Sequence, residues 1–180
     1  ILIMFWQKKI LFSVLLFSQT KLVPSAYIIM LLAILSAVFY STPPVKLESS
    51  GYGELIVSVL TTFLVPAFAF VLQTGEWHRL VLMSAVPLTA IHLAMLIALE
   101  LPDFANDLKY EKRTLIIRLG WQTAMGLHNI LILSAFLLLA LARLSGYPWF
   151  AMLAGMAALP VGLFQIWQMR QIANGARVNW

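Results

Sequence analysis

The segment LVLMSAVPLTAIHLAMLIALEL, residues 80–101, carries a single charged residue, Glu100, near its end. An α-helix needs about 20 apolar residues to cross the roughly 30 Å hydrocarbon core of a bilayer, so this segment is predicted to span a membrane. Charges, proline or glycine bound four further segments of the same kind, which are residues 23–40, 55–73, 121–144 and 149–169.

Residues 1–17 form a poorer sixth candidate, because Lys8 and Lys9 lie in the middle of the segment. An adjacent lysine pair at the centre of a bilayer is costly. Either this segment is tilted and partly interfacial, or residues are missing between its two halves. We therefore expect an all-α, polytopic transmembrane helix bundle with about six visible crossings.

The composition supports a membrane protein. Hydrophobic residues make up 62% of the 180-residue chain and charged residues 11%, against about 45–50% and about 25% in soluble domains. Too few polar residues are present to cover a water-exposed surface. This excludes a secreted domain, a soluble nucleotide-binding enzyme and, despite the net charge of +5, a nucleic-acid-binding protein. The chain has no cysteine, so disulfides and thiolate chemistry are excluded too.

The basic residues predict the orientation in the membrane. Cytoplasmic loops of membrane proteins carry an excess of lysine and arginine. One side of the predicted bundle has only Lys21, Arg79 and Arg143. We therefore expect an integral protein of the cytoplasmic membrane, with the long loops 41–54 and 102–120 on its cytoplasmic side. That side would carry Lys46, Lys109, Lys112, Arg113, Arg118, Arg170 and Arg177.

The second of these loops is rich in carboxylates. Asp103, Asp107 and Glu111 follow one another at intervals of four, so on a helix all three would share one face. Carboxylates together with water and phosphate oxygens are the ligands that Mg²⁺ prefers, and Lys112 and Arg113 could bind the phosphate. Spacing alone also permits the alternative of ordinary solvated charges in a loop flanking the membrane.

The first loop begins after Tyr40, a residue type that suits the headgroup level of a membrane. Pro43 and Pro44 cannot extend the preceding helix, and Gly51 and Gly53 permit tight turns before the next span. An ordinary interhelical loop would give the same pattern.

Taken together and in this order, the two loops resemble the UbiA superfamily of intramembrane prenyltransferases. The tail of the second loop is most similar to the 1,4-dihydroxy-2-naphthoate polyprenyltransferases of menaquinone synthesis. The residues that carry the resemblance are Tyr40-Ser41, Pro43-Pro44, Lys46-Leu47, Gly51, Gly53-Glu54, Pro102-Asp103, Asp107, Lys112-Arg113-Thr114-Leu115 and Arg118-Leu119-Gly120.

The resemblance implies nine helices and two aspartate-rich motifs that face each other over a cytoplasmic-side cavity. It also implies transfer of a polyprenyl group from its diphosphate to an aromatic acceptor. By position, Asp103 and Asp107 would bind Mg²⁺, and Tyr40 would line the cavity near the reacting carbon. The candidates for diphosphate contacts are Lys46, Lys112 and Arg113. Departure of the diphosphate leaves an allylic cation that the ring attacks, and a naphthoate ring then loses its carboxylate.

Against the family pattern, the first aspartate-rich motif and the ninth helix are absent from these residues, and Glu111 stands where the family usually has glycine. We therefore expect one prenyltransferase-like domain, residues 1–180, truncated at both ends. Polyprenyl diphosphate, an aromatic acceptor and the lipid bilayer are the expected partners, and nucleic acid is not. The alternatives are another acceptor (a chlorin, haem, homogentisate or a glycerol-phosphate lipid) or a non-catalytic membrane subunit of a larger complex.

Overall fold

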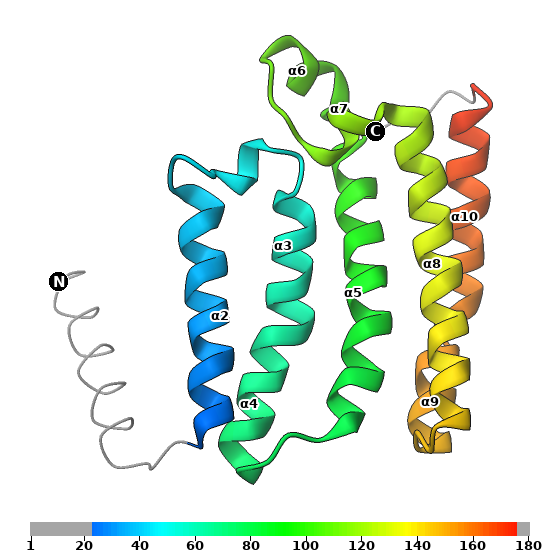
Figure 1. Ribbon diagram of the computed structural model, residues 1–180. Helices are drawn as coiled ribbons and strands as arrows, with labels where there is room; N and C mark the ends of the chain where they lie inside the picture. The colour runs from blue at the N-terminus through cyan, green and yellow to red at the C-terminus, as the bar shows by residue number, and fades with distance from the viewer. Residues whose placement is uncertain (1–22, 176–180) are drawn as a thin grey trace, which may run out of the picture.

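The computed structural model describes residues 23–175 as a bundle of helices (Figure 1). Five helical stretches in this part of the chain are long and apolar enough to cross a membrane, which confirms the predicted all-α polytopic bundle. The doubtful segment 1–17, with Lys8 and Lys9, lies outside the described residues. The five stretches are α2 (Pro24–Ser41), α3 with η2 and α4 (Gly53–Thr74), α5 (Arg79–Glu100), α8 (Trp121–Leu144), and α9 with α10 (Trp149–Ala173).

The helices alternate in direction, so the connections gather at two ends of the bundle (Figure 1). We call the end formed by residues 42–53 and 101–120 the loop end, and the end formed by residues 75–78 and 145–148 the turn end. The loop end carries the short helices η1 (Leu47–Ser49), α6 (Phe104–Lys109) and α7 (Leu115–Leu119).

Basic residues are divided unequally between these ends. Among the described residues the turn end has Arg79 and Arg143. Lys21 and Arg177 lie outside the described residues, and for the remaining positions the predicted separation of charges is confirmed. The loop end has Lys46, Lys109, Lys112, Arg113, Arg118 and Arg170.

The second span changes its winding in the middle. Val59 ends α3, residues Leu60–Leu64 form the π-helical turn η2, and α4 (Val65–Thr74) follows. Pro66 explains the change, because proline has no N–H to donate and its ring crowds the carbonyl four residues earlier. In the π turn the N–H of Val65 bonds to the carbonyl of Leu60 instead. The span therefore passes the proline without ending.

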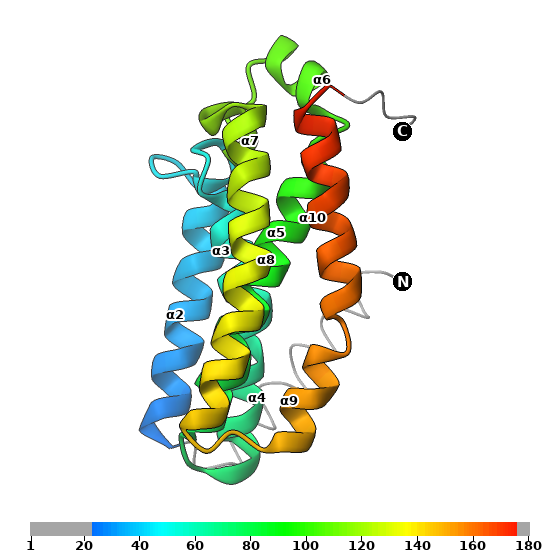
Figure 2. The ribbon, with the colours of Figure 1, turned by 90° about the vertical axis from the view of Figure 1, so that its right-hand side faces the viewer.

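The last span, by contrast, is broken. The sequence predicted one continuous helix over 149–169, whereas α9 (Trp149–Met156) and α10 (Leu159–Ala173) are separate helices. Pro160 is the physical reason, since it is tolerated in the first turn of a helix but not in its interior. Figure 2 shows α10 beside α8, with α9 below it at a different angle.

The core lies where α5 and α8 pair along their length. Side chains of these helices pack with Met169 of α10 and with Ile116 of α7, which is fully buried. Through Ile116 the loop end is attached to the same core. This cluster consists of Leu93, Ile97, Leu101, Ile116, Ala124, Met125 and Met169.

Candidate active site

A cavity of about 530 Å³ opens at the loop end, among the ends of α2, α3 and α5 and the two loops. Its wall combines acidic, basic, hydroxyl and apolar side chains that are far apart in the sequence. The lining residues are Tyr40, Lys46, Glu48, Ser49, Gly53, Glu54, Val57, Leu96, Glu100, Lys112, Arg113 and Thr114.

Four of the residues singled out from the sequence line this cavity together. Tyr40 comes from the last turn of α2, Lys46 from the loop before η1, and Lys112 and Arg113 from the loop between α6 and α7. Lys46 has a left-handed backbone with φ 38°, and its Nζ lies 3.6 Å from Oε1 of Glu48. The fold therefore brings three cationic side chains and one phenol around a single space.

The two aspartates, Asp103 and Asp107, are not among the lining residues. Asp103 is exposed at the N-cap of α6, and its carbonyl accepts the N–H of Asp107 at 2.8 Å. Asp107 is 5% exposed, and its Oδ1 lies 2.7 Å from Nζ of Lys112. The hydrogen bond and the charge of Asp107 raise the pKa of the Lys112 ammonium. Asp107 is thus connected to the cavity only through its ion pair with Lys112, which lines it.

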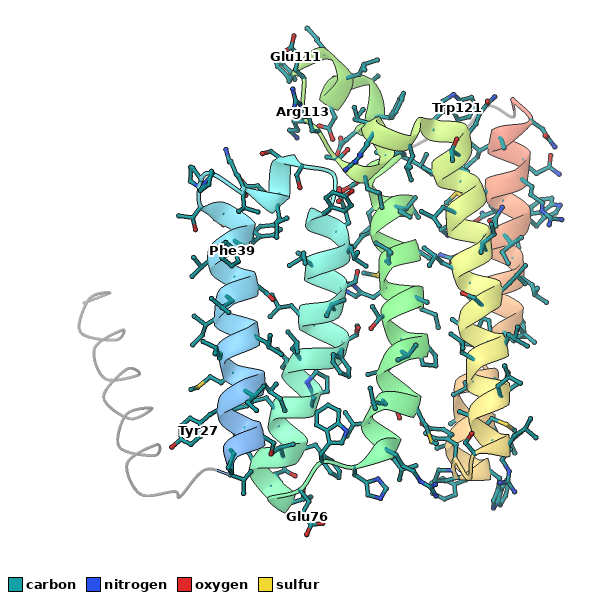
Figure 3. All side chains as sticks on the ribbon, in the orientation of Figure 1. Tyr27, Phe39, Glu76, Glu111, Arg113 and Trp121 are labelled. Atoms are coloured by element: carbon teal, nitrogen blue, oxygen red, sulfur yellow. The ribbon has the colours of Figure 1, made fainter. Side chains whose placement is uncertain are left out.

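The third carboxylate of the predicted helical face does not join the other two. Helix α6 ends at Lys109, and Glu111 has a left-handed backbone with φ 53°, so the interval of four breaks there. Figure 3 shows Glu111 on the loop that projects beyond the helix ends, with Arg113 below it. Because the helix ends before Glu111, the three carboxylates of Asp103, Asp107 and Glu111 do not share one helical face.

The carboxylates of Asp103 and Asp107 are the candidate magnesium ligands. Within residues 23–175, no three His, Cys, Asp or Glu side chains lie close enough together to hold a metal ion by themselves. Mg²⁺, however, usually takes only one or two protein carboxylates and completes its shell with water and substrate phosphates. The donor chemistry of Asp103 and Asp107 fits a magnesium ion shared with a phosphate ligand, and does not fit one held by the described protein groups alone.

Two glutamates in the cavity wall, the buried Glu54 and the half-buried Glu100, were not predicted as site residues. Glu54, 8% exposed at the start of α3, accepts the N–H of Leu115 through Oε1 at 2.9 Å. Glu100, at the end of α5, lies beside the carboxyl of Glu54 and the backbone amide of Ile116. Among the described residues, Oε2 of each glutamate is buried without a hydrogen-bond partner. A signal was present, because both are single acids at the edge of an apolar span.

Arg118 was predicted only as part of a motif, yet it joins the two loops. Its Nη1 donates to the carbonyl of Ser50 at 3.2 Å, and its guanidinium lies 4.5 Å from the ring centroid of Tyr52. Gly51 sits against Arg118: a Cβ added there would lie 3.0 Å from Cδ of the arginine, and the φ of +77° also favours glycine.

An apolar groove of about 340 Å³ runs between the second span and α5, with further walls from α8. Thr89 is the one polar residue of its wall. The apolar lining consists of Leu55, Val59, Phe63, Leu82, Val86, Ala90, Leu93, Leu131 and Leu138.

Comparison with known proteins gives one match for this chain, to a family model. A family model described as the UbiA prenyltransferase family matches residues 9–179, which is nearly the whole chain. No curated protein and no solved structure matches the chain.

Proposed function

The chain belongs to the UbiA prenyltransferase family, and from this we propose that it transfers a polyprenyl group from polyprenyl diphosphate to 1,4-dihydroxy-2-naphthoate. The observation that carries the proposal is the loop-end cavity, where side chains from three separate segments surround one space. The choice of acceptor rests on the sequence of the second loop, residues 112–120.

Binding of the diphosphate is assigned to Lys46, Lys112 and Arg113. Ammonium and guanidinium groups form short, charge-assisted hydrogen bonds to phosphate oxygens, and arginine can do so with two parallel bonds. All three side chains line the cavity. They would stabilise the negative charge that develops on the leaving diphosphate.

Magnesium is proposed as the cofactor, bound by Asp103 and Asp107 together with phosphate oxygens. When bound, Mg²⁺ neutralises negative charge on the diphosphate and so makes it a better leaving group. The burial of Asp107 in contact with Lys112 puts this carboxylate next to a cationic cavity residue.

Tyr40 is proposed to lie beside the reacting carbon of the prenyl group. In the proposed reaction the bond between the allylic carbon and the diphosphate oxygen breaks, and a ring carbon of the acceptor supplies the electron pair for the new carbon–carbon bond. The carboxylate on that ring carbon then leaves as carbon dioxide. The phenol ring of Tyr40 offers a π face to the allylic cation.

The apolar groove beside α5 is the proposed site of the polyprenyl chain. Its wall is almost entirely hydrocarbon, as a pocket for an apolar ligand requires. The loop end is assigned to the cytoplasmic face of the cell membrane, because the described basic residues concentrate there.

The test is a prenyl-transfer assay with the purified protein in nanodiscs, polyprenyl diphosphates of several lengths, and magnesium or EDTA. We expect Mg²⁺-dependent product with 1,4-dihydroxy-2-naphthoate, and its loss in Asp103→Asn and in Asp107→Asn. Glu111→Gln is the matched control, since it neutralises an exposed acid of the same loop that is not assigned to magnesium.

Unchanged turnover in either aspartate variant contradicts the assigned magnesium ligands. Transfer to homogentisate, a chlorin or haem in place of the naphthoate keeps the enzyme but changes the acceptor. A folded protein that transfers to none of these acceptors is instead a non-catalytic membrane subunit.

A further inference from the structure

The loop that carries Lys112 and Arg113 is held to the bundle by a buried carboxylate. Glu54 of α3 accepts the N–H of Leu115 at 2.9 Å, across 61 residues of sequence. A hydrogen bond between a carboxylate and an N–H is charge-assisted and is stronger than one between neutral groups. Since Glu54 is 8% exposed, little water competes for its oxygens.

The next residue of the loop meets a second carboxyl. Glu100, at the end of α5, lies beside the backbone amide of Ile116 and against Glu54. Leu115 and Ile116 are the first two residues of α7, and the first amides of a helix have no partner within it. Glu54 thus stabilises the start of α7, and the carboxyl of Glu100 lies beside the same helix end.

A contact in the opposite direction completes the attachment. Arg118 of α7 donates to the carbonyl of Ser50 and stacks on Tyr52. Arg118 also fills the space where a side chain at residue 51 would lie, so the first loop follows the shape of the second. The two loops form one unit.

This attachment decides where the cationic residues point. Lys112 and Arg113 precede Leu115 by three and two residues, and both line the cavity. Lys112 has Asp107 as a fixed partner, whereas within residues 23–175 Arg113 makes no ion pair. On the C-terminal side of Arg113, the backbone that Glu54 holds at Leu115 is therefore the nearest fixed point.

We propose that Glu54 is a positioning residue for binding of the prenyl diphosphate: it holds the amide of Leu115 and thereby directs Lys112 and Arg113 into the cavity. The inference rests on the proposed function for its substrate, but the contact between Glu54 and the loop can be tested without that substrate.

Two variants separate positioning from direct contact. Glu54→Gln keeps a side-chain carbonyl oxygen that can accept the Leu115 N–H, whereas Glu54→Ala removes the acceptor. We expect Glu54→Ala to raise the KM for polyprenyl diphosphate on the order of tenfold or more, with the KM for the aromatic acceptor unchanged. Glu54→Gln should stay within about threefold of the parent.

The matched control is Thr62→Val, because Thr62 lines neither the cavity nor the apolar groove. It removes a polar contact between the second span and α5, 2.7 Å between Oγ1 of Thr62 and Oγ1 of Thr89. This contact lies within the spans, away from the loops. A substitution that only loosens the pairing of these spans should lower Tm and leave both KM values unchanged.

A substrate-free measurement keeps the inference independent of the enzyme assay. Trypsin cleaves after Arg113, and release of the loop should speed this cleavage in Glu54→Ala but not in Glu54→Gln. Arg118→Ala should speed it as well, since the second anchor is lost.

If no acceptor is prenylated but cleavage changes as expected, the proposed function fails and the attachment of the loop stands. Unchanged cleavage in Glu54→Ala, or an unchanged KM for the diphosphate in an active enzyme, overturns the positioning role. An equal rise in that KM for Glu54→Gln and Glu54→Ala also overturns it, because the charge itself would then contact the ligand.

Discussion

At the turn end, α4 passes to α5 through residues 75–78 and α8 passes to α9 through residues 145–148. Each connection uses a glycine in the left-handed region, Gly75 with φ 75° and Gly146 with φ 90°. At the loop end the connections are longer, contain η1, α6 and α7, and are held by side chains. Glu54, Lys112 and Arg118 each bridge two elements there.

The conformation of the connections is determined differently at the two ends. A short turn needs only a backbone that can reverse, and glycine supplies that locally. A long loop has many conformations, and side-chain contacts must select one of them at the cost of conformational entropy. Substitutions at the loop end should therefore change ligand binding, whereas substitutions near the turn end should change stability alone.

The largest expected effect concerns which face of the membrane each end occupies. The chain has no cysteine, so single cysteines can be placed at the exposed positions Glu111 and Glu76, which lie at opposite ends (Figure 3). In intact cells a membrane-impermeant maleimide should label Glu76→Cys, and should label Glu111→Cys only after the membrane is permeabilised. Labelling is close to all or none, because a charged reagent does not cross the hydrocarbon core.

The reverse labelling pattern would place the loop end outside the cytoplasm and overturn the assigned orientation. Labelling of both positions in intact cells would contradict the separation of the two ends by a bilayer. The parent chain, which has no thiol, is the blank for both measurements.

A smaller effect is expected at Lys112. Lys112→Ala removes one cationic group from the cavity and should raise the KM for polyprenyl diphosphate by roughly 10- to 100-fold, the value of one hydrogen bond to a charged group. Lys109→Ala is the control, because Lys109 belongs to the same loop and does not line the cavity. Equal KM values in the two variants would contradict the assignment of Lys112.

The pH dependence of Lys112 has a definite sign. Its pKa in the folded protein is raised above the usual lysine value of 10.5 by the hydrogen bond and charge of Asp107. The stabilisation from this pair is therefore fully present below pH 10.5 and is lost as the pH rises through the higher folded value. The Tm difference between parent and Lys112→Ala should stay constant from pH 7 to about 9.5 and shrink above about pH 10.5. A difference that already shrinks between pH 7 and about 9.5 contradicts the pairing.

Local sequence was enough to place the membrane spans. The predicted span 121–144 matches α8, and the predicted span 80–101 differs from α5 by one residue at each end, because an apolar run bounded by charges determines a span by itself. The break between α9 and α10 was missed although Pro160 marked it. Over 149–169 hydropathy stays high on both sides of the proline, and hydropathy alone does not register a missing N–H.

The candidate site was less predictable. Four of the predicted site residues line one cavity, Tyr40, Lys46, Lys112 and Arg113. Lys112 and Arg113 were indicated by their place after the acidic residues, whereas the roles of Tyr40 and Lys46 came from the family pattern. The bond from Glu54 to Leu115 could not be derived, since it depends on how α3 and α7 pack across 61 residues. The interval of four also left open where a helix would end, and the left-handed Glu111 with the bond from the Lys112 N–H to the Asp107 carbonyl follows that end.

The smallest expected effect is at Gly155 of α9, where two helices pack closely near the turn end. A Cβ added to Gly155 would lie 2.5 Å from Cδ2 of Leu139 on α8, so Gly155→Ala must displace the Leu139 side chain, which does not line the loop-end cavity. Overpacking of this kind costs about 1–3 kcal/mol, which lowers Tm while both KM values stay unchanged. Gly126→Ala in α8 is the control, because no atom lies within 4 Å of its added Cβ, and it should leave Tm unchanged or raise it. In a Leu139→Ala background, Gly155→Ala should lower Tm less than it does in the parent, because the crowded side chain is gone. A rise in either KM without a fall in Tm would break the division between the two ends, since it would couple packing near the turn end to ligand binding at the loop end.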